Sequence, residues 1–313
     1  MDIGEPQAYD GKRKPWIAVL LSLLQPGLGQ LYNGQPQKAY WLIPSFILIG
    51  VMAYTAGVFF TDSIGVILSL SSIFYVFIFI FAIVDGWRNA KRLGRNYYLR
   101  RYNHWLVYGA LIIFPYAIRS SSAQFFRTNY LEPFVVPTDS MAPILISGDR
   151  FYADKRVNLE NVRRGDLYLI KAPYAADTIL VKRLLGIPGD KIKIKAGEII
   201  LNGTLLKHQA LPYASSSLGP TFMQSHTFFS ETVDRKKYVI TFHNGQEHED
   251  YEIALGPGEV FFIGDNRHDS HDSRQFGSLS VNDIVGKPLL IWFSHQTEPL
   301  GIRWERIGQR LDG

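Results

Sequence analysis

The sequence contains no cysteine, and this absence removes several kinds of chemistry at once. Without thiols the chain has no disulfide bonds, no cysteine-ligated zinc and no thiol nucleophile. Basic and aromatic residues are not gathered in the way that nucleic-acid-binding surfaces require, so we expect no nucleic-acid partner. Charge is missing as well from two long stretches, residues 40–60 and 63–84, of this 313-residue chain.

The two uncharged stretches predict membrane-spanning helices. A helix needs about 20 apolar residues to cross about 30 Å of hydrocarbon, because each residue rises about 1.5 Å. Helices of soluble proteins rarely run so long without a charge on a solvent-facing side. A third apolar run, residues 105–118, becomes a span if the helix continues to about Phe126 and Arg119 reaches for the interface. The bilayer is therefore an expected partner.

The first apolar segment, residues 16–32, is interrupted by Gln25, Pro26 and Gly27, which predicts a helix that breaks midway. Two interpretations stay open: the segment is interfacial or re-entrant, or it is a further span. The region 1–126 is thus expected to anchor the chain with two to four transmembrane or re-entrant helices.

Basic residues without any acid crowd between the second and third apolar runs: Arg88, Lys91, Arg92, Arg95, Arg100 and Arg101. The positive-inside rule predicts that this loop is cytoplasmic. A following span then places the chain after about residue 127 on the outer side of the membrane.

Beyond residue 130 the pattern changes to short alternating segments separated by turns, which predicts a β-rich domain over 127–313. The expected strands are 167–171, 191–195, 198–201, 237–243, 251–255, 259–263 and 284–293. Asn202-Gly203 and Asn244-Gly245 each predict a hairpin turn. The segment 209–230 is rich in Ser, Pro and Gly and predicts a long surface excursion.

Three clusters in this domain carry candidate chemistry: Ser140-Met141 after a proline-rich stretch, Lys182-Arg183 followed by Gly186-Ile187-Pro188-Gly189-Asp190, and Gly264-Asp265-Asn266-Arg267 followed by Asp272-Ser273-Arg274. In this order, over about residues 131–294, they resemble the bacterial signal peptidase I family. The resemblance implies N-terminal transmembrane α-helices followed by a mostly-β, antiparallel sheet or barrel-like, extracytoplasmic catalytic domain. It also implies endoproteolytic removal of signal peptides from exported preproteins without a cofactor or a metal.

A serine hydroxyl is a poor nucleophile at neutral pH and needs a base within about 3 Å. Lysine serves as that base only when neutral, and desolvation lowers its pKa. Apolar residues flank Lys182 on both sides, at 179–181 and 184–185, so we expect an apolar pocket without a carboxylate contact. The family's dyad falls on Ser140 as nucleophile and Lys182 as general base, a variant of the triad that needs no histidine.

The resemblance also assigns supporting roles. The Ser140 amide and the Thr138 hydroxyl, where the family commonly has serine, are the expected oxyanion donors. Ser270 is expected to orient the lysine, and Asp272 with Arg274 to form a structural ion pair. Asp265, Asn266 and Arg267 are expected to brace the turn.

Asp139 departs from the family, which usually has glycine at this position. A carboxylate directed at the dyad would keep Lys182 charged, so we expect Asp139 to point to solvent.

Substrate choice is expected to rest on small apolar pockets, because signal peptides end in an A-x-A-like pattern. The candidate lining residues are Phe134, Val136, Leu145 and Val181, which serve equally well as strand core. The chain is then expected in the cytoplasmic (inner) membrane, multi-pass, with its catalytic domain on the periplasmic side.

Two rival interpretations stay open. His268, Asp269, His271 and Asp272 form a compact set of possible metal ligands, although no established catalytic metal frame accompanies them. A catalytically inactive membrane protein that binds signal peptides or partners is the other, and it rests on Asp139. The sequence does not indicate an oligomeric state.

Overall fold

The computed structural model describes residues 8–9, 12–59, 64–93, 97–175, 177–212, 217–247, 250–296 and 301–311. The chain divides into two compact units, Met1–Arg127 and Thr128–Gly313. Each unit is described by itself below.

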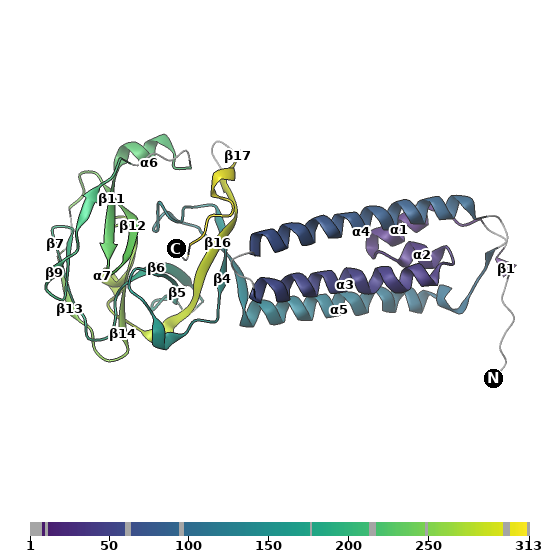
Figure 1. Cartoon of the computed structure of the whole chain (residues 1–313), viewed down its shortest axis with the longest axis horizontal. Helices are drawn as coiled ribbons and strands as arrows, with labels where there is room; N and C mark the ends of the chain where they lie inside the picture. Colours follow the sequence, from purple (N-terminus) through teal and green to yellow (C-terminus); the bar gives the residue numbers. More distant parts are fainter. Residues whose placement is uncertain are drawn as a thin grey trace. The chain divides into compact units, whose positions relative to one another are not determined.

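The first unit is helical, and its long helices follow the apolar runs of the sequence (Figure 1). Its elements are β1 (Ala8–Tyr9), α1 (Pro15–Leu24), α2 (Leu28–Tyr32), α3 (Pro36–Phe59), α4 (Ile64–Arg92), β2 (Tyr97–Tyr98), η2 (Arg101–Asn103) and α5 (Trp105–Asn129). The third apolar run thus continues to Asn129 as one helix. Among the described residues, Ser69–Arg92 and Trp105–Asn129 are long and apolar enough to cross a membrane.

The first apolar segment breaks as predicted, between α1 and α2, where Gly27 takes a left-handed φ of 104°. The two ends of the segment lie together: the Lys14 amide donates to the Tyr32 hydroxyl at 3.1 Å. The Arg13 guanidinium also lies 4.2 Å from the centroid of the Tyr32 ring. The two ends of the segment therefore lie side by side.

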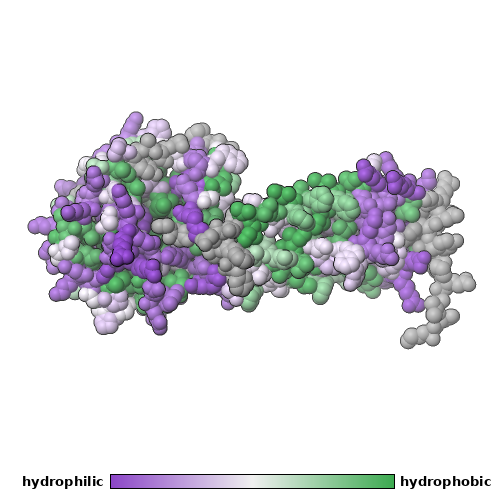
Figure 2. All heavy atoms as spheres, viewed as in Figure 1, coloured by the Kyte–Doolittle hydropathy of each residue, from purple (hydrophilic) through white to green (hydrophobic). Residues whose placement is uncertain are grey.

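The helical unit carries its large apolar side chains on the outside (Figure 2). Trp41, Ile113 and Phe114 are 70%, 69% and 66% exposed, respectively. Inside, polar side chains attach α2 to α4: Gln30 Nε2 donates to the Ala82 carbonyl at 2.8 Å and Asn33 Nδ2 to the Gly86 carbonyl at 2.7 Å. This is the reverse of the pattern expected for a unit surrounded by water.

The second unit is built on an eight-stranded antiparallel sheet with the order β15-β14-β6-β5-β16-β4-β3, and β17 pairs with β16 (Figure 1). Its strands are β3 (Leu131–Val135), β4 (Asp149–Asp154), β5 (Leu167–Lys171), β6 (Ile179–Gly186), β14 (Glu259–Ile263), β15 (Leu279–Ser280), β16 (Ile284–Gln296) and β17 (Gly301–Ile302). Register shifts in the β14–β6, β16–β4 and β16–β5 pairs mark bulges, which bend strands and let this sheet curl.

Two smaller sheets complete the unit. One has the order β13-β7-β8-β9 and the other β10-β11-β12. The remaining elements are β7 (Lys191–Lys195), β8 (Glu198–Leu201), β9 (Thr204–Leu205), β10 (His208–Ala210), α6 (Pro220–Ser225), β11 (His226–Val233), β12 (Lys236–His243), β13 (Tyr251–Ala254), α7 (Ser273–Phe276), η3 (Leu159–Asn161), η4 (Val281–Asp283) and η5 (Trp304–Arg306). All seven expected strands are present, so the prediction of a mostly-β domain is confirmed.

Two local predictions need correction. Asn202-Gly203 joins the paired strands β8 and β9 as expected, but Asn244-Gly245 does not close a hairpin, because β12 pairs with β11 and β13 pairs with β7. Tyr251 and Ile253 of β13 pack against the apolar cluster around Ile192 and Ile194, and this burial outweighs the local turn signal.

The segment 209–230 is only partly a surface excursion. It contains the end of β10, all of α6 and the start of β11, while residues 213–216 lie outside the described residues. Phe222, Met223 and Phe228 pack against Ala142 and Ile146, so their apolar surface belongs to a core cluster.

Candidate active site

Ser140 lies in the turn between β3 and β4, and buried residues on its C-terminal side hold this turn. Met141 and Leu145 are 2% and 0% exposed, and the Leu145 amide donates to the Met141 carbonyl at 3.1 Å. The Ala142 amide donates to the Asp139 carbonyl at 2.9 Å. The serine is thereby fixed at the edge of the core while its own side chain stays partly accessible.

Lys182 lies within β6 and is 2% exposed. Its Nζ is 2.9 Å from Ser140 Oγ and 3.0 Å from Ser270 Oγ. The structure therefore brings together three side chains from three separate sequence clusters, at distances suited to proton transfer.

Burial lowers the pKa of Lys182 to about 8, while Asp272 raises it, Arg274 lowers it and Asp265 raises it by smaller amounts. Within the described part of the chain, no carboxylate forms an ion pair with Lys182. The lowered pKa favours the neutral form of Lys182, which is the form that accepts a proton. The expectation of an apolar site without a carboxylate contact agrees with this geometry.

The segment Gly264–Asn266 packs against the dyad from one side. A side chain on Gly264 would meet Ser270 Oγ and would lie 2.7 Å from the Ser140 carbonyl oxygen, so only glycine fits. Asn266 holds the serine turn, because its amide donates to the Ser140 carbonyl at 3.2 Å and its Nδ2 to the Asp139 carbonyl at 3.2 Å.

Asp272 and Arg274 form the expected pair, with Arg274 Nε and Nη2 each 2.8 Å from a carboxylate oxygen of Asp272. Asp272 Oδ2 also accepts a hydrogen bond from the Gly264 amide at 2.8 Å. Burial alone would raise the pKa of Asp272, but the hydrogen bonds and charge of Arg274 lower it below its usual value. The pair thus ties the loop that carries Ser270 to the segment under the dyad.

Thr138 and Asp139 are both exposed. Thr138 Oγ1 lies 3.4 Å from Ser140 Oγ, a long contact that still places a hydroxyl beside the nucleophile. The Asp139 carboxylate accepts a hydrogen bond from the Ser147 amide at 2.7 Å, so it is directed away from Lys182 as expected. In the described part of the chain the Ser140 amide donates no hydrogen bond, which leaves it available to a developing oxyanion.

The four candidate pocket residues belong to one apolar cluster. Val136 and Leu145 are buried in it, and Phe134 and Val181 pack against it partly buried. Their place in the cluster agrees with the core interpretation.

The four possible metal ligands point to separate partners. Asp272 pairs with Arg274, and Asp269 Oδ2 lies 3.1 Å from His226 Nε2. His271 stacks on Tyr174 with ring centroids 4.8 Å apart, and His268 Nδ1 lies 3.1 Å from the His243 carbonyl. These contacts do not direct the four side chains toward one point.

Sequence reasoning missed two ion pairs beside the dyad. Arg183 Nε and Nη2 donate to Asp265 at 2.7 and 2.5 Å, and the buried Arg267 pairs with Glu231. The first pair had a weak signal in the sequence, because Arg183 directly follows Lys182 and Asp265 directly follows Gly264. No local signal indicated Glu231, which lies 36 residues from Arg267.

A serine hydroxyl hydrogen-bonded to a buried amine is the arrangement used by those serine hydrolases in which lysine replaces histidine. The sequence matches the family described as "Signal peptidase, peptidase S26" over residues 106–293. The chain belongs to this signal peptidase family.

Individual relatives carry the same description. "Signal peptidase I" of Rickettsia bellii (strain OSU 85-389) is 27% identical over 199 residues, which cover 54% of this chain and 68% of that protein. "Signal peptidase I U" of Bacillus subtilis (strain 168) is 30% identical over 169 residues, covering 53% of this chain and 78% of that protein. A crystal structure of a signal peptidase I from Enterococcus faecalis V583 matches with a TM-score of 0.27 and 20% identity over 41% of this chain and 96% of that one.

Proposed function

We propose that this protein removes N-terminal signal peptides from exported preproteins, with Ser140 as the nucleophile and Lys182 as the general base. One observation carries the assignment of the two residues: Lys182 Nζ lies 2.9 Å from Ser140 Oγ, and Lys182 is 2% exposed. Membership of the signal peptidase family supports the substrate class.

In the first half of the reaction, neutral Lys182 takes the proton of Ser140 as Oγ attacks the scissile carbonyl carbon. The carbonyl π electrons move to oxygen and form a tetrahedral oxyanion. As the oxyanion collapses, the C–N bond breaks and Lys182 gives its proton to the leaving amine of the mature protein. The signal peptide remains bound to Ser140 as an ester.

In the second half, Lys182 removes a proton from a water molecule that attacks the ester carbonyl. Collapse of this second intermediate breaks the bond to Ser140 Oγ, and Lys182 returns a proton to the serine. The signal peptide leaves with a free carboxylate, and the enzyme regains its starting state.

Ser140 N–H and the Thr138 hydroxyl are the proposed donors to the oxyanion, since the amide is available and the hydroxyl is 3.4 Å from Ser140 Oγ. Ser270 orients Lys182 by accepting its hydrogen bond at 3.0 Å, and Asp272 with Arg274 supports the Ser270 loop. Phe134, Val136, Leu145 and Val181 are the proposed walls of the pockets for the small residues of an A-x-A-like site.

The helical unit anchors the enzyme in the cytoplasmic (inner) membrane. We propose three crossings by α3, α4 and α5, with the α1–α2 hairpin re-entering from the same side as the basic loop at 88–101. β1 pairs with β2, which places residues 8–9 beside that loop. With the basic loop on the cytoplasmic side, the single crossing by α5 that follows it puts the catalytic unit on the periplasmic side.

The chain has no native cysteine, so single cysteines report this topology cleanly. Arg101→Cys should resist a membrane-impermeant thiol reagent in intact spheroplasts, whereas Lys195→Cys should react. The opposite labelling would overturn the proposed orientation without bearing on the dyad.

The activity itself is tested by incubating a preprotein that carries an Ala-x-Ala site with the detergent-solubilised protein. The parent should cut after that site, and Ser140→Ala and Lys182→Ala variants that remain folded should not. Cleavage by either variant at the parental rate would place the active site elsewhere.

A binding protein without activity is the less favoured alternative. It required Asp139 to act on the dyad and Lys182 to be exposed and charged. Asp139 is instead bound by the Ser147 amide, and burial lowers the pKa of Lys182 to about 8. A parent that binds the preprotein but never cuts it would restore this alternative.

A further inference from the structure

Glu231 of β11 is a fully buried carboxylate that none of the steps above uses. It is 1% exposed and lies directly across the β11–β12 pair from Tyr238, whose hydroxyl donates to Glu231 Oε1 at 2.7 Å. Its main partner is Arg267, which is 2% exposed and donates Nη1 to Glu231 Oε2 at 3.0 Å and Nη2 to Oε1. A buried pair of this kind costs desolvation free energy, so its presence calls for a reason other than stability.

Arg267 connects Glu231 to the segment under the dyad. Its Nε donates to the Gly264 carbonyl at 3.2 Å, and its backbone amide donates to the Thr241 carbonyl of β12 at 2.9 Å. The Thr241 amide in turn donates to the Asp265 carbonyl at 2.9 Å. The β11–β12 ribbon therefore holds the backbone of Asp265 and Arg267, on either side of Asn266, whose amide donates to the Ser140 carbonyl.

The same ribbon also reaches the neighbour of Lys182. The Arg183 guanidinium, which is paired with Asp265, lies 3.9 Å from the centroid of the Tyr238 ring. Glu231 thus contacts Arg267, which follows the glycine turn, and Tyr238 contacts Arg183, which follows Lys182 in β6.

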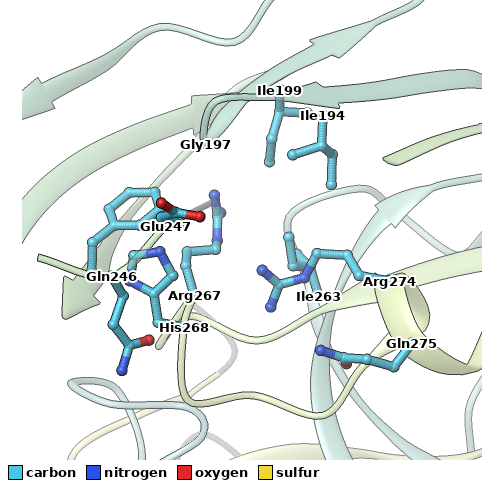
Figure 3. Close-up of a pocket in the computed structure, with 11 residues that line it drawn as sticks. Ile194, Gly197, Ile199, Gln246, Glu247, Ile263, Arg267, His268, Arg274 and Gln275 are labelled. Carbon is cyan, nitrogen blue, oxygen red and sulfur yellow. The ribbon is translucent and has the colours of Figure 1, made fainter. Parts of the chain in front are cut away.

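Space is available for Arg267 to move. Arg267, Arg274 and the exposed Glu247 are among the residues that line a cavity of about 140 Å³ (Figure 3). The attraction of Glu231 draws the guanidinium to the wall of this cavity and keeps Nε on the Gly264 carbonyl. Without that charge the guanidinium is free to turn into the cavity and release Gly264.

We propose that Glu231 is a positioning residue for the dyad. By holding Arg267, it fixes the position of the segment Gly264–Asn266. In that position Asn266 holds the Ser140 turn, and Gly264 leaves room for the Ser270 hydroxyl to reach Lys182. The proposal rests on the proposed function of the dyad. It gives the β10–β12 sheet a role in catalysis that needs no contact with substrate.

The test compares two carboxylate-to-amide variants of the full chain. Glu231→Gln removes the charge that holds Arg267. Its matched control is Asp190→Asn, because Asp190 is also buried, at 4% exposed, and pairs with a different arginine. Arg164 Nε and Nη2 donate to Asp190 at 2.8 and 2.7 Å. We expect Glu231→Gln to lower kcat for the preprotein about 10- to 100-fold with little change in KM, since displacements near 1 Å cost about that much. Asp190→Asn should lose thermal stability and keep its kcat.

A double variant, Glu231→Gln with Arg267→Gln, separates positioning from folding. Removing both buried charges should restore stability, yet kcat should stay low because the bond from Arg267 Nε to Gly264 is gone. Recovery of kcat together with stability would overturn the proposal, as would a Glu231→Gln enzyme with parental kcat.

Hydrogen exchange decides the matter even if the parent proves inactive and the proposed function fails. The Asn266 amide, which donates to the Ser140 carbonyl, should exchange faster in Glu231→Gln than in the parent or in Asp190→Asn. Equal exchange in all three proteins would remove the proposal.

Discussion

The two units of this chain treat polar and apolar groups in opposite ways. In the helical unit, large apolar side chains such as Trp41 and Ile113 lie outside, while Gln30 and Ser22 are completely buried. In the β unit, Phe261 and Phe262 are completely buried. The proposed membrane anchoring accounts for this difference, because lipid around the helical unit and water around the β unit each accept the groups that lie outside.

In both units, however, buried polar side chains lie where the structure or the proposed chemistry requires a particular residue. Gln30 attaches the α1–α2 hairpin to α4, and Lys182 with its partners forms the candidate active site. Burial of a polar group costs free energy unless a partner satisfies it, so each such group points to a structural or chemical need.

The largest effect should come from exchanging the buried lysine for an apolar residue of similar length. Lys182→Met should abolish signal peptide cleavage, a loss of at least about 10²–10⁴-fold, because the general base is gone. The same variant should be more stable than the parent at pH 7 by a few kcal/mol, since the lysine pKa falls from 10.5 to about 8 on burial.

The sign of the stability effect follows from proton binding. Between about pH 8 and 10.5 the unfolded chain holds a proton on Lys182 that the folded chain has lost, so parental stability rises with pH in that window. Denaturation of parent and variant across this range should show a gap that closes as pH increases. A gap that does not depend on pH would contradict the assigned burial.

The second largest effect should show whether the exposed apolar residues of each unit face lipid or water. Ile113 on α5 is 69% exposed and Leu205 on β9 is 44% exposed, so both would tolerate a charge if water surrounded both units. Ile113→Asp should reduce the fraction of protein that resists alkaline extraction from membranes, because a charge at a helix centre costs about 3 kcal/mol in lipid. Leu205→Asp should leave that fraction unchanged.

A smaller effect concerns the charges around the lysine in the β unit. Asp272 raises and Arg274 lowers the pKa of Lys182, so Asp272→Asn should move the acid limb of kcat/KM from about pH 8 to lower pH. Arg274→Gln should move it to higher pH. Profiles measured at a temperature where both variants are folded should therefore shift in opposite directions, and shifts in one common direction would contradict the electrostatic account.

The smallest effect should come from the polar contact inside the helical unit. Gln30→Leu removes the bonds to the Ala82 carbonyl and to Asp85, and should cost about 1 kcal/mol in detergent, as intramembrane hydrogen bonds usually do. Ser45→Ala is the matched control, because among the described residues Ser45 Oγ donates only to the Trp41 carbonyl of its own helix. Equal unfolding curves for the two variants would show that the hairpin does not depend on Gln30.

Local sequence determined much of this protein. Uncharged stretches specified the long helices, period-two alternation specified β7, and the Gln25-Pro26-Gly27 break specified the end of α1. These features follow from chain-local chemistry: helix length, side-chain period and the restrictions of proline and glycine. The three motif clusters likewise carried the candidate residues Ser140 and Lys182.

Tertiary structure alone decided how distant segments pair. The Asn244-Gly245 turn looks like a hairpin in sequence, yet β13 pairs with β7 because this pairing buries Ile253 against an apolar core. The hydrogen bond between the Lys14 amide and the Tyr32 hydroxyl has no local signal in the sequence either. The same holds for the ion pair between Glu231 and Arg267. Such contacts depend on burial and on pairing buried charges, which only the folded chain brings about.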